Sequence, residues 1–375
     1  MPLSIGCAAS EGGADNLNLE RVNKLQIRLA EQKLDALIVT NRSNVRYLSG
    51  FTGSAGMLVI GLDFQNLITD GRYDIQAHQQ TKGFNIRITR RPLRTTASIL
   101  KRKRATRIGV EAISLTMARK DELAHELRDS PGRLSGTKGL VEEHRVVKDA
   151  GEIATLQQAI SLTDNAYAHT LTLLRPGVTE KDLALEMEWF MRTNGADSLS
   201  FSIIVASGAR SALPHGIASE KKIAHGDLVT LDFGALINGY HADLTRTVTV
   251  GKPKQRSRQL YRTVYDAQQR AIAAATNGML AKKLDAVART AIKGKGLGKF
   301  FTHALGHGLG LDIHEAPTLS NQSKDLLQPN MVVTIEPGVY VPDVGGVRIE
   351  DVIRITDDGA EILSQAPSPP KIPIV

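Results

Sequence analysis

The sequence predicts an α+β protein of two domains, an α/β N-terminal domain and a strand-rich C-terminal domain with two related halves. Three observations predict this organisation. Short apolar runs alternate with helical patterns up to about residue 140, as in α/β domains. A polar, charged stretch at residues 141–153 then separates this part from the rest, and an apolar pattern ending in an acid and a glycine occurs twice beyond it. At 375 residues the chain is long enough for both domains.

The composition is that of an ordinary globular protein. Hydrophobic residues make up 42% of the chain, and no run approaches the roughly 20 apolar residues that a membrane-spanning helix needs. The single cysteine, Cys7, excludes a disulfide framework and suits a reducing compartment. Residues 1–18 show no basic segment followed by an apolar run, so we expect a disordered tail rather than a secretory signal. These features predict a cytoplasmic protein.

The N-terminal domain is expected to span residues 19–140. It begins with an amphipathic helix at residues 19–31, whose apolar residues recur at helical spacing: Leu19, Val22, Leu25 and Leu29. Glycines at residues 53–56 predict a turn. Short apolar runs predict strands at residues 36–39, 57–60, 66–69 and 108–110, and a further helix is expected at residues 115–127.

The second domain is expected to span residues 141–375. A long helix follows the charged stretch and is broken at Pro176, after which Thr179 opens another helix that runs to about residue 191. Beyond Phe201 the chain becomes rich in strand patterns. Two further helices, at about residues 259–275 and 281–292, separate the strand pairs.

An internal similarity relates the two halves of this second domain. Residues 228–234 (LVTLDFG) align without gaps with residues 332–338 (VVTIEPG). Each segment places an acid, Asp232 or Glu336, at the end of an apolar strand and before a glycine. A second strand with another acid follows each of them, Asp243 in one half and Glu350 in the other. We therefore expect two facing hairpins that bring four carboxylates to one centre.

These four carboxylates predict a metal site. Carboxylates among Val, Leu and Ile are costly to bury unless cations hold them there. A pair of divalent ions would do so, because bridging carboxylates and one imidazole, here His307, can fill two adjacent sites. Oxygen-rich ligation favours Mn²⁺, with Co²⁺, Zn²⁺ and Fe²⁺ as alternatives. The sequence therefore predicts a two-metal hydrolase.

Strand alternation adds neighbours to this centre. Side chains two residues apart share a face of a strand, so Thr245 lies on the same face as Asp243 and is suited to hydrogen-bond a ligating carboxylate. Arg348 shares a face with Glu350, and its guanidinium is expected to orient a carboxylate or stabilise an oxyanion.

Four histidines form a second group around the same centre. His303 and His307 are four residues apart, but the intervening glycine-rich sequence argues against a helix and so against the HExxH arrangement. His314 follows in the same segment, and His215 lies in a loop before the first hairpin. A single loop histidine is usually an exposed or capping residue, whereas four near one acidic cluster indicate function.

The net charge of +8 raises the question of nucleic acid binding. Much of the excess lies between Arg87 and Arg107. No aromatic residue interleaves this segment as a stacking platform would require, so we interpret it as a solvated face of the N-terminal domain.

Taken together, the motifs resemble those of the pita-bread metallopeptidases, the family of methionine aminopeptidase, aminopeptidase P and prolidase. The resemblance rests on five segments: residues 231–234 (LDFG), 242–247 (ADLTRT), 306–310 (GHGLG), 334–338 (TIEPG) and 346–351 (GVRIED). Within this family the chain is similar to the proline-specific branch, through residues 214–216 (PHG), 303–307 (HALGH) and 314–317 (HEAP) together with Arg348. Residues 47–56 (YLSGFTGSAG) and 69–73 (TDGRY) resemble the creatinase-like N-terminal domain of Xaa-Pro aminopeptidases.

The resemblance implies a role for each candidate residue. It implies that Asp232 and Asp243 bind one ion, that His307 and Glu336 bind the other, and that Asp243 and Glu350 bridge the two. Glu336 would also be the general base. His215, His314 and Arg348 would stabilise the tetrahedral intermediate and the leaving nitrogen, and His303 would line the proline pocket.

The implied activity is that of a Xaa-Pro aminopeptidase, which releases an N-terminal residue ahead of proline by attack of a hydroxide held between two ions. The alternative is a Xaa-Pro dipeptidase (prolidase) of the same fold. A hypothesis of another class is a non-catalytic protein on this fold that binds peptides or RNA. The expected partners are small peptides with proline in second position and a second copy of the chain, with no membrane or nucleic acid.

Overall fold

The computed structural model describes residues 11–375, with side chains from Leu17 onward. It consists of two compact units that divide between Arg145 and Val146. The first helix, α1 (Glu11–Glu31), begins earlier than the helix expected from residue 19, because the apolar stripe on which that expectation rested starts only at Leu19. The expected tail therefore overlaps α1, and its first ten residues lie outside the described part of the chain.

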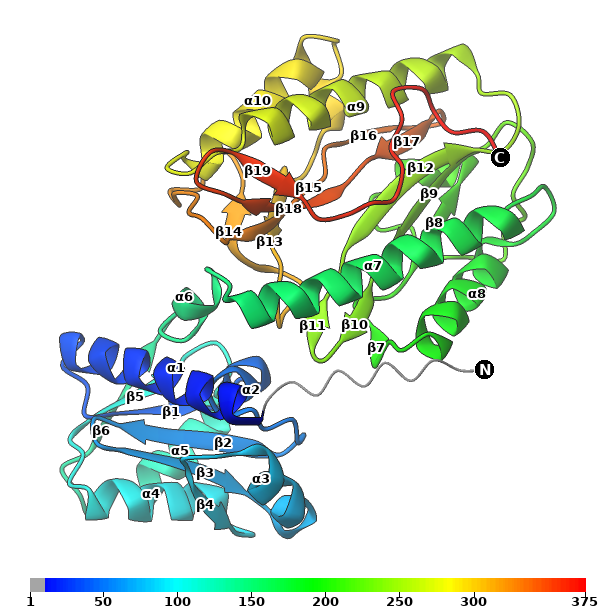
Figure 1. The fold of residues 1–375 in the computed structure, drawn as a ribbon. Coiled ribbons are helices and arrows are strands. Elements are labelled where there is room, and N and C mark those ends of the chain that lie inside the picture. Colours follow the sequence, from blue (N-terminus) through cyan, green and yellow to red (C-terminus); the bar gives the residue numbers. More distant parts are fainter. Residues whose placement is uncertain (1–10) are drawn as a thin grey trace. The chain divides into compact units, whose positions relative to one another are not determined.

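The first unit is built on a six-stranded mixed sheet (Figure 1). Its strand order is β4-β3-β2-β1-β5-β6. The pairs β1–β2 and β2–β3 are antiparallel, and β1–β5, β5–β6 and β3–β4 are parallel. The bounds are β1 (Ala36–Val39), β2 (Gly56–Gly61), β3 (Phe64–Thr69), β4 (Asn85–Ile88), β5 (Arg107–Glu111) and β6 (Arg133–Thr137). This sheet confirms the predicted α/β class and adds two strands, β4 and β6.

Helices lie on both faces of this sheet, as Figure 1 shows. The helices of this unit are α1, α2 (Arg42–Ser49), α3 (Asp74–Gln80), α4 (Pro92–Arg102), α5 (Met117–Glu126) and the short α6 (Glu142–Arg145), with a 3-10 turn at Gly71–Tyr73. The predicted stripe of α1 is confirmed, because Val22, Leu25 and Leu29 are buried whereas Ile27 is 63% exposed.

The basic segment between Arg87 and Arg107 covers part of β4, all of α4 and the start of β5. It holds nine Lys and Arg residues and no acid, so the other residues together carry a net charge of −1. Lys103 pairs with Asp63 at 2.9 Å and Arg107 with Asp35 at 3.0 Å. The excess of positive charge therefore belongs to one short stretch of the first unit.

The second unit contains four long helices and several small sheets. The helices are α7 (Ala150–Leu173), α8 (Glu180–Thr193), α9 (Gln255–Ala274) and α10 (Ala281–Lys293), close to their predicted places. One group of strands comprises β7 (Ser198–Leu199), β8 (Ile204–Ser207), β9 (Leu228–Phe233), β10 (Ala235–Ile237), β11 (Tyr240–His241) and β12 (Leu244–Thr249). The other comprises β13 (Gly306–Gly308), β14 (Glu315–Leu319), β15 (Val332–Ile335), β16 (Gly338–Val341), β17 (Gly345–Arg348), β18 (Asp351–Ile355) and β19 (Ala360–Ile362). Two 3-10 turns occur at Gly208–Ala212 and Gly298–Phe300.

Two hydrophobic cores correspond to the two predicted halves. In the first half α7 and α8 cover β8, β9 and β12, and in the second half α9 and α10 cover the strands from β13 to β18 (Figure 1). The predicted hairpins are present, because β9 pairs antiparallel with β12 and β15 with β18. Each core thus supports one pair of strands at whose ends the predicted acidic residues lie.

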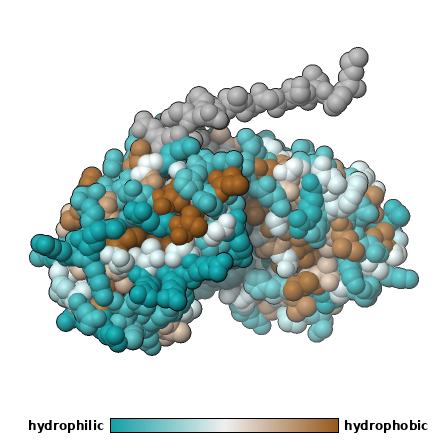
Figure 2. Space-filling view, turned by 90° about the horizontal axis from the view of Figure 1, so that it is seen from below, coloured by the Kyte–Doolittle hydropathy of each residue, from teal (hydrophilic) through white to brown (hydrophobic). Residues whose placement is uncertain are grey.

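Exposed apolar side chains are dispersed. On the face in Figure 2 hydrophilic side chains predominate and hydrophobic ones form small separate groups, as is usual for folded proteins in water. Of the helices in residues 11–375, none combines the length and the apolar composition needed to cross a membrane.

Candidate metal centre

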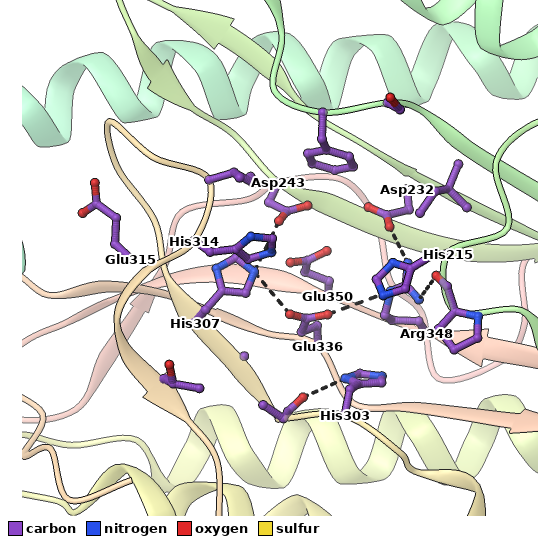
Figure 3. Close-up of a pocket in the computed structure, with 18 of the residues that line it drawn as sticks. His215, Asp232, Asp243, His303, His307, His314, Glu315, Glu336, Arg348 and Glu350 are labelled. Atoms are coloured by element: carbon purple, nitrogen blue, oxygen red, sulfur yellow. Dashed lines mark hydrogen bonds and ion pairs between the residues drawn. The ribbon is translucent and has the colours of Figure 1, made fainter. Parts of the chain in front are cut away.

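All nine candidate site residues line one cavity of about 810 Å³ in the second unit. In Figure 3 the four carboxylates lie around a common space, with imidazoles beside them. The structure therefore brings together every residue that the sequence predicted for the site: His215, Asp232, Asp243, His303, His307, His314, Glu336, Arg348 and Glu350.

The four carboxylates occupy related places in the two halves. Asp232 lies near the end of β9, and Glu336 directly follows β15. Asp243 directly precedes β12, and Glu350 directly precedes β18. The acids on the second strands thus lie at the breaks where β12 and β18 begin, rather than within a strand as the alternation argument assumed.

Tight glycine contacts fix the strand that carries His307. A Cβ atom on Gly306 would lie 2.0 Å from the carbonyl oxygen of Thr334, and one on Gly308 would lie 2.1 Å from that of Ala316. No side chain fits at either position, so β13 can pass between its neighbours only with glycine on both sides of His307. The segment is a strand, which confirms that His303 and His307 do not share a helix.

Hydrogen bonding defines the tautomer of His307. Its Nδ1 lies 2.9 Å from the carbonyl oxygen of Gly308, which can only accept, so Nδ1 carries the hydrogen. The lone pair of Nε2 then faces Asp243 at 3.6 Å and Glu336 at 3.4 Å. Burial lowers the pKa of His307 to about 4, so the imidazole is neutral. A neutral imidazole with a free lone pair is the form that binds a metal ion.

The carboxylates are strained electrostatically in the absence of cations. Burial, and then the neighbouring Glu350, Asp232 and Glu336, raise the pKa of Asp243 well above its usual range. Burial and the charges of Glu336 and Asp232 do the same for Glu350. Burial raises the pKa of Glu336 to about 7. The protein thus holds several acids where their ionised forms are unfavourable, and divalent cations would relieve this.

The donor set fits such cations. One oxygen of Asp243, one of Glu350 and one nitrogen of His307 lie within 4.8 Å of one another. The Oε1 atom of Glu350 is buried and has no hydrogen-bond partner among the described residues. An unpaired buried carboxylate oxygen is costly unless a cation occupies the space in front of it.

Arg348 is anchored beside the carboxylates by four hydrogen bonds. Its Nη2 donates to Asp232, and its Nη1 donates to the carbonyl of Pro214 at 3.1 Å and to the hydroxyl of Tyr340 at 2.7 Å. Its Nε donates to Thr245 at 3.0 Å. Thr245 in turn donates to Oε2 of Glu350 at 2.8 Å, so Thr245 and Arg348 both point toward the carboxylates, as strand alternation predicted.

Tyr340 is a functional candidate that the sequence analysis missed. Its hydroxyl accepts from Arg348 and lies 3.0 Å from Nε2 of His303. Nδ1 of His303 faces the carbonyl oxygen of Ala304 at 2.7 Å, so Nε2 is unprotonated and Tyr340 donates to it. Burial raises the pKa of Tyr340 to about 12 and lowers that of His303 to about 4, which keeps both groups neutral. The only sequence signal for Tyr340 was strand alternation, which places its side chain on the same face as Gly338, two residues after Glu336.

The remaining histidines lie on the walls of the cavity. The ring of His314 packs against that of His307, with ring centres 4.4 Å apart. The neighbouring Glu315 points away from the carboxylates (Figure 3) and forms a buried ion pair with Lys148 at 3.1 Å. His215 lies close to Arg348 at the other side. Imidazole rings thus flank the carboxylate cluster on two sides.

Comparison with known proteins identifies the family. Residues 154–357 match metallopeptidase family M24, and residues 21–147 match the creatinase/prolidase N-terminal domain. A Xaa-Pro dipeptidase of Pyrococcus furiosus is 37% identical over 349 residues, which are 92% of this chain and 98% of that protein.

Solved structures agree with this match. The structure of a Xaa-Pro dipeptidase from Bacillus anthracis has a TM-score of 0.92 and 41% identity, covering 96% of this chain and 100% of that chain. That of an X-Pro aminopeptidase from Thermotoga maritima has a TM-score of 0.85 and 37% identity, covering 93% and 100%. The chain therefore belongs to metallopeptidase family M24, the pita-bread metallopeptidases, in the proline-peptidase branch with a creatinase/prolidase N-terminal domain.

Proposed function

We propose that this protein is a Xaa-Pro dipeptidase that depends on two divalent metal ions. The observation that carries the proposal is the convergence of three buried carboxylates, the partly buried Glu336 and a neutral His307 on one cavity, with an unpaired oxygen of Glu350 among them. The sequence alone favoured the Xaa-Pro aminopeptidase. The dipeptidase is now preferred because relatives named Xaa-Pro dipeptidase match nearly the whole chain.

The metal ligands that we propose are Asp232, Asp243, His307, Glu336 and Glu350. Asp243 and Glu350 would bridge the ions, as their adjacent buried oxygens allow. When bound, the ions would polarise the substrate carbonyl and make water a nucleophile at neutral pH. We propose Mn²⁺ for both positions because oxygen donors dominate the set.

The protein's own groups would handle the protons. Glu336 would accept a proton from the attacking water and pass it to the nitrogen that leaves when the C–N bond breaks. His215 and His314, at the cavity wall, would donate hydrogen bonds to the oxygen that gains charge and to the leaving nitrogen, with Arg348 beside them. Since a proline nitrogen carries no hydrogen in the peptide, the enzyme needs no acceptor for one there. His303 would contact the proline ring from the cavity floor.

One observation favours the aminopeptidase as the second candidate. A dipeptide carries its terminal carboxylate into the cavity, whereas a longer peptide does not. Arg348, the one guanidinium among the described residues that line the cavity, already donates four of its five N–H groups to the protein. Little positive charge is left to receive that carboxylate, which suits longer substrates.

Three substrates separate the two candidates: Ala-Pro, Ala-Pro-amide and Ala-Pro-Ala, each assayed with Mn²⁺. If the terminal carboxylate is recognised, its charge-assisted hydrogen bonds contribute about 1.5–3 kcal/mol, so amidation should lower kcat/KM roughly 10- to 100-fold. The dipeptidase predicts this loss and a similar loss for the tripeptide.

Equal or faster hydrolysis of the amide and the tripeptide would replace the dipeptidase by the aminopeptidase. Chelator should abolish all activity and added Mn²⁺ should restore it. Absence of turnover with Mn²⁺, Co²⁺, Zn²⁺ and Fe²⁺ on all three substrates would leave only the non-catalytic hypothesis.

Two further properties are proposed from the family resemblance and the composition. We propose a homodimer, which light scattering on the eluting protein would test by its molar mass. We also propose a cytoplasmic location, for which fractionation of the source cells is the measurement.

A further inference from the structure

A buried ion pair lies on the reverse side of the strands that carry the metal-site residues. Thr245 points toward Glu350, and the next residue, Arg246, points the opposite way because strand side chains alternate. Asp351 likewise follows Glu350. Arg246 and Asp351 meet there at 2.7 Å, with side chains 2% and 5% exposed.

Every N–H group of Arg246 has an acceptor. Nη1 donates to the carbonyl of Thr245 at 3.1 Å and to that of Glu350. Nη2 donates to Asp351 and, at 2.6 Å, to the carbonyl of Ala366, while Nε donates to that of Pro367 at 3.3 Å. A guanidinium has five such groups in a fixed plane, so this one is fully used.

Two of these bonds act on the backbone of the metal site. The N–H of Glu350 donates to the carbonyl of Thr245 at 3.1 Å, which is where the first half of the unit meets the second. Nη1 of Arg246 donates to the carbonyl of Thr245 and to that of Glu350, from the side of the strands opposite to the carboxylates. A rotation of the peptide at Glu350 would therefore break a bond to Arg246 as well as displace the carboxylate.

The pair is itself held from two other segments. The second oxygen of Asp351 accepts from Nε2 of Gln268 on α9 at 2.7 Å. The carbonyls of Ala366 and Pro367 belong to the segment beyond β19. Arg246 therefore links three parts of the second unit to the backbone of Glu350: its own strand β12, the segment beyond β19 and, through Asp351, the helix α9.

We infer that Arg246 and Asp351 are positioning residues that set the metal affinity of Glu350, an inference that rests on the proposed metal centre. Stability alone does not explain the pair, because well-packed hydrophobic residues often replace buried ion pairs without loss. A metal site has a stricter need: the ligand oxygen must be held in place before the ion binds. Residues that orient ligands typically change metal affinity about 10- to 100-fold when substituted.

The test compares Mn²⁺ binding by calorimetry to chelator-treated wild type, Arg246→Lys, Arg246→Met and Asp351→Asn. Lysine keeps the charge but not the five planar donors, and asparagine keeps the shape of Asp351 without its charge. We expect the Kd of at least one Mn²⁺ to rise roughly 10- to 100-fold in each variant. Arg354→Met is the matched control, since Arg354 lies on the same strand as Asp351 and its one ion pair within the described part of the chain is with the half-exposed Glu361. Its Mn²⁺ affinity should equal that of wild type.

Thermal unfolding with and without Mn²⁺ separates positioning from a merely structural role. A structural role lowers the Tm of both forms equally. Positioning shrinks the gain that Mn²⁺ brings, by about 1.4 kcal/mol for each tenfold loss of affinity. We also expect kcat to return to within about threefold of wild type at saturating Mn²⁺, because the ligands themselves are intact.

Unchanged Mn²⁺ affinity in the folded variants would overturn the inference while leaving the proposed function standing. Failure of Asp351→Asn to fold even with Mn²⁺ would also overturn it, by showing that the pair serves the fold as a whole. If wild-type protein binds no Mn²⁺, Co²⁺, Zn²⁺ or Fe²⁺, the proposed metal centre itself is refuted, and with it the proposed function.

Discussion

Replacing Glu336 with glutamine should make the metal-free protein more stable while it destroys activity. Burial raises the pKa of this carboxyl from 4.5 to about 7. At about 1.4 kcal/mol for each tenfold change in acidity, ionised Glu336 costs the folded metal-free protein roughly 3 kcal/mol. Glutamine has nearly the same shape and no charge. It forfeits weak contacts with Thr334 at 3.4 Å, His307 at 3.4 Å and Arg348 at 4.0 Å.

The size of this stabilisation depends on pH. A carboxyl with a raised pKa keeps its full contribution to stability below about pH 4.5 and loses it as the pH rises to about 7. Glu336→Gln and wild type should therefore unfold alike at pH 4.5, and the variant should be more stable by up to roughly 3 kcal/mol at pH 8. In a unit of this size that corresponds to a rise in Tm of at most roughly 6–12 °C.

Thermal or denaturant unfolding in chelator, from pH 4.5 to 8, measures this difference. Added Mn²⁺ should reverse the order, because wild type gains stability from the ion and the variant gains less. Glu361→Gln is the control for removing a carboxylate charge, since Glu361 is half exposed on β19, and the gain in stability expected of Glu336→Gln should be absent from it. A Glu336→Gln protein that is less stable than wild type at pH 8, or a difference that is constant with pH, would refute the reasoning.

Three further substitutions test the site through activity and metal content. Asp243→Asn should lower turnover by more than about 100-fold at saturating Mn²⁺ with folding retained, and wild-type turnover would contradict its bridging role. Arg348→Lys should lower kcat/KM about 100-fold at unchanged Mn²⁺ stoichiometry, because lysine cannot reproduce the planar donors that bond Asp232, Tyr340 and Thr245 together; elemental analysis alongside the assay checks this. Thr245→Val removes the hydroxyl between Arg348 and Glu350 at constant volume, so the Kd for Mn²⁺ should rise roughly 10- to 100-fold in calorimetry. An unchanged Kd would show that Thr245 does not orient Glu350.

The centre could be predicted from the sequence because its chemistry is concentrated in short segments. Acidic residues at the ends of apolar strands are conspicuous, and the repeat of residues 228–234 in 332–338 doubled the signal. The alternation rule also predicted the direction of Thr245, which the bond to Glu350 confirms. Local pattern was sufficient wherever the site depended on one strand and its face.

The missed features depend on contacts between distant segments. Tyr340 in an apolar strand is indistinguishable by pattern from a packing residue, and only its position between Arg348 and His303 reveals more. Arg246 stood in a recognised motif, but its five acceptors come from segments up to 121 residues away. The helix α4 was missed because basic residues obscured a short buried stripe that includes Leu93, Ala97 and Leu100.

The uneven placement of basic residues has a practical consequence. The isoelectric point near 9.5 reflects the 21 residues from Arg87 to Arg107, since the remainder of the chain is close to electroneutral. Retention on a cation-exchange resin thus says little about the charge of the peptides that the cavity accepts. Substituting a few of these arginines would shift solubility and crystallisation behaviour while leaving the catalytic half of the chain untouched.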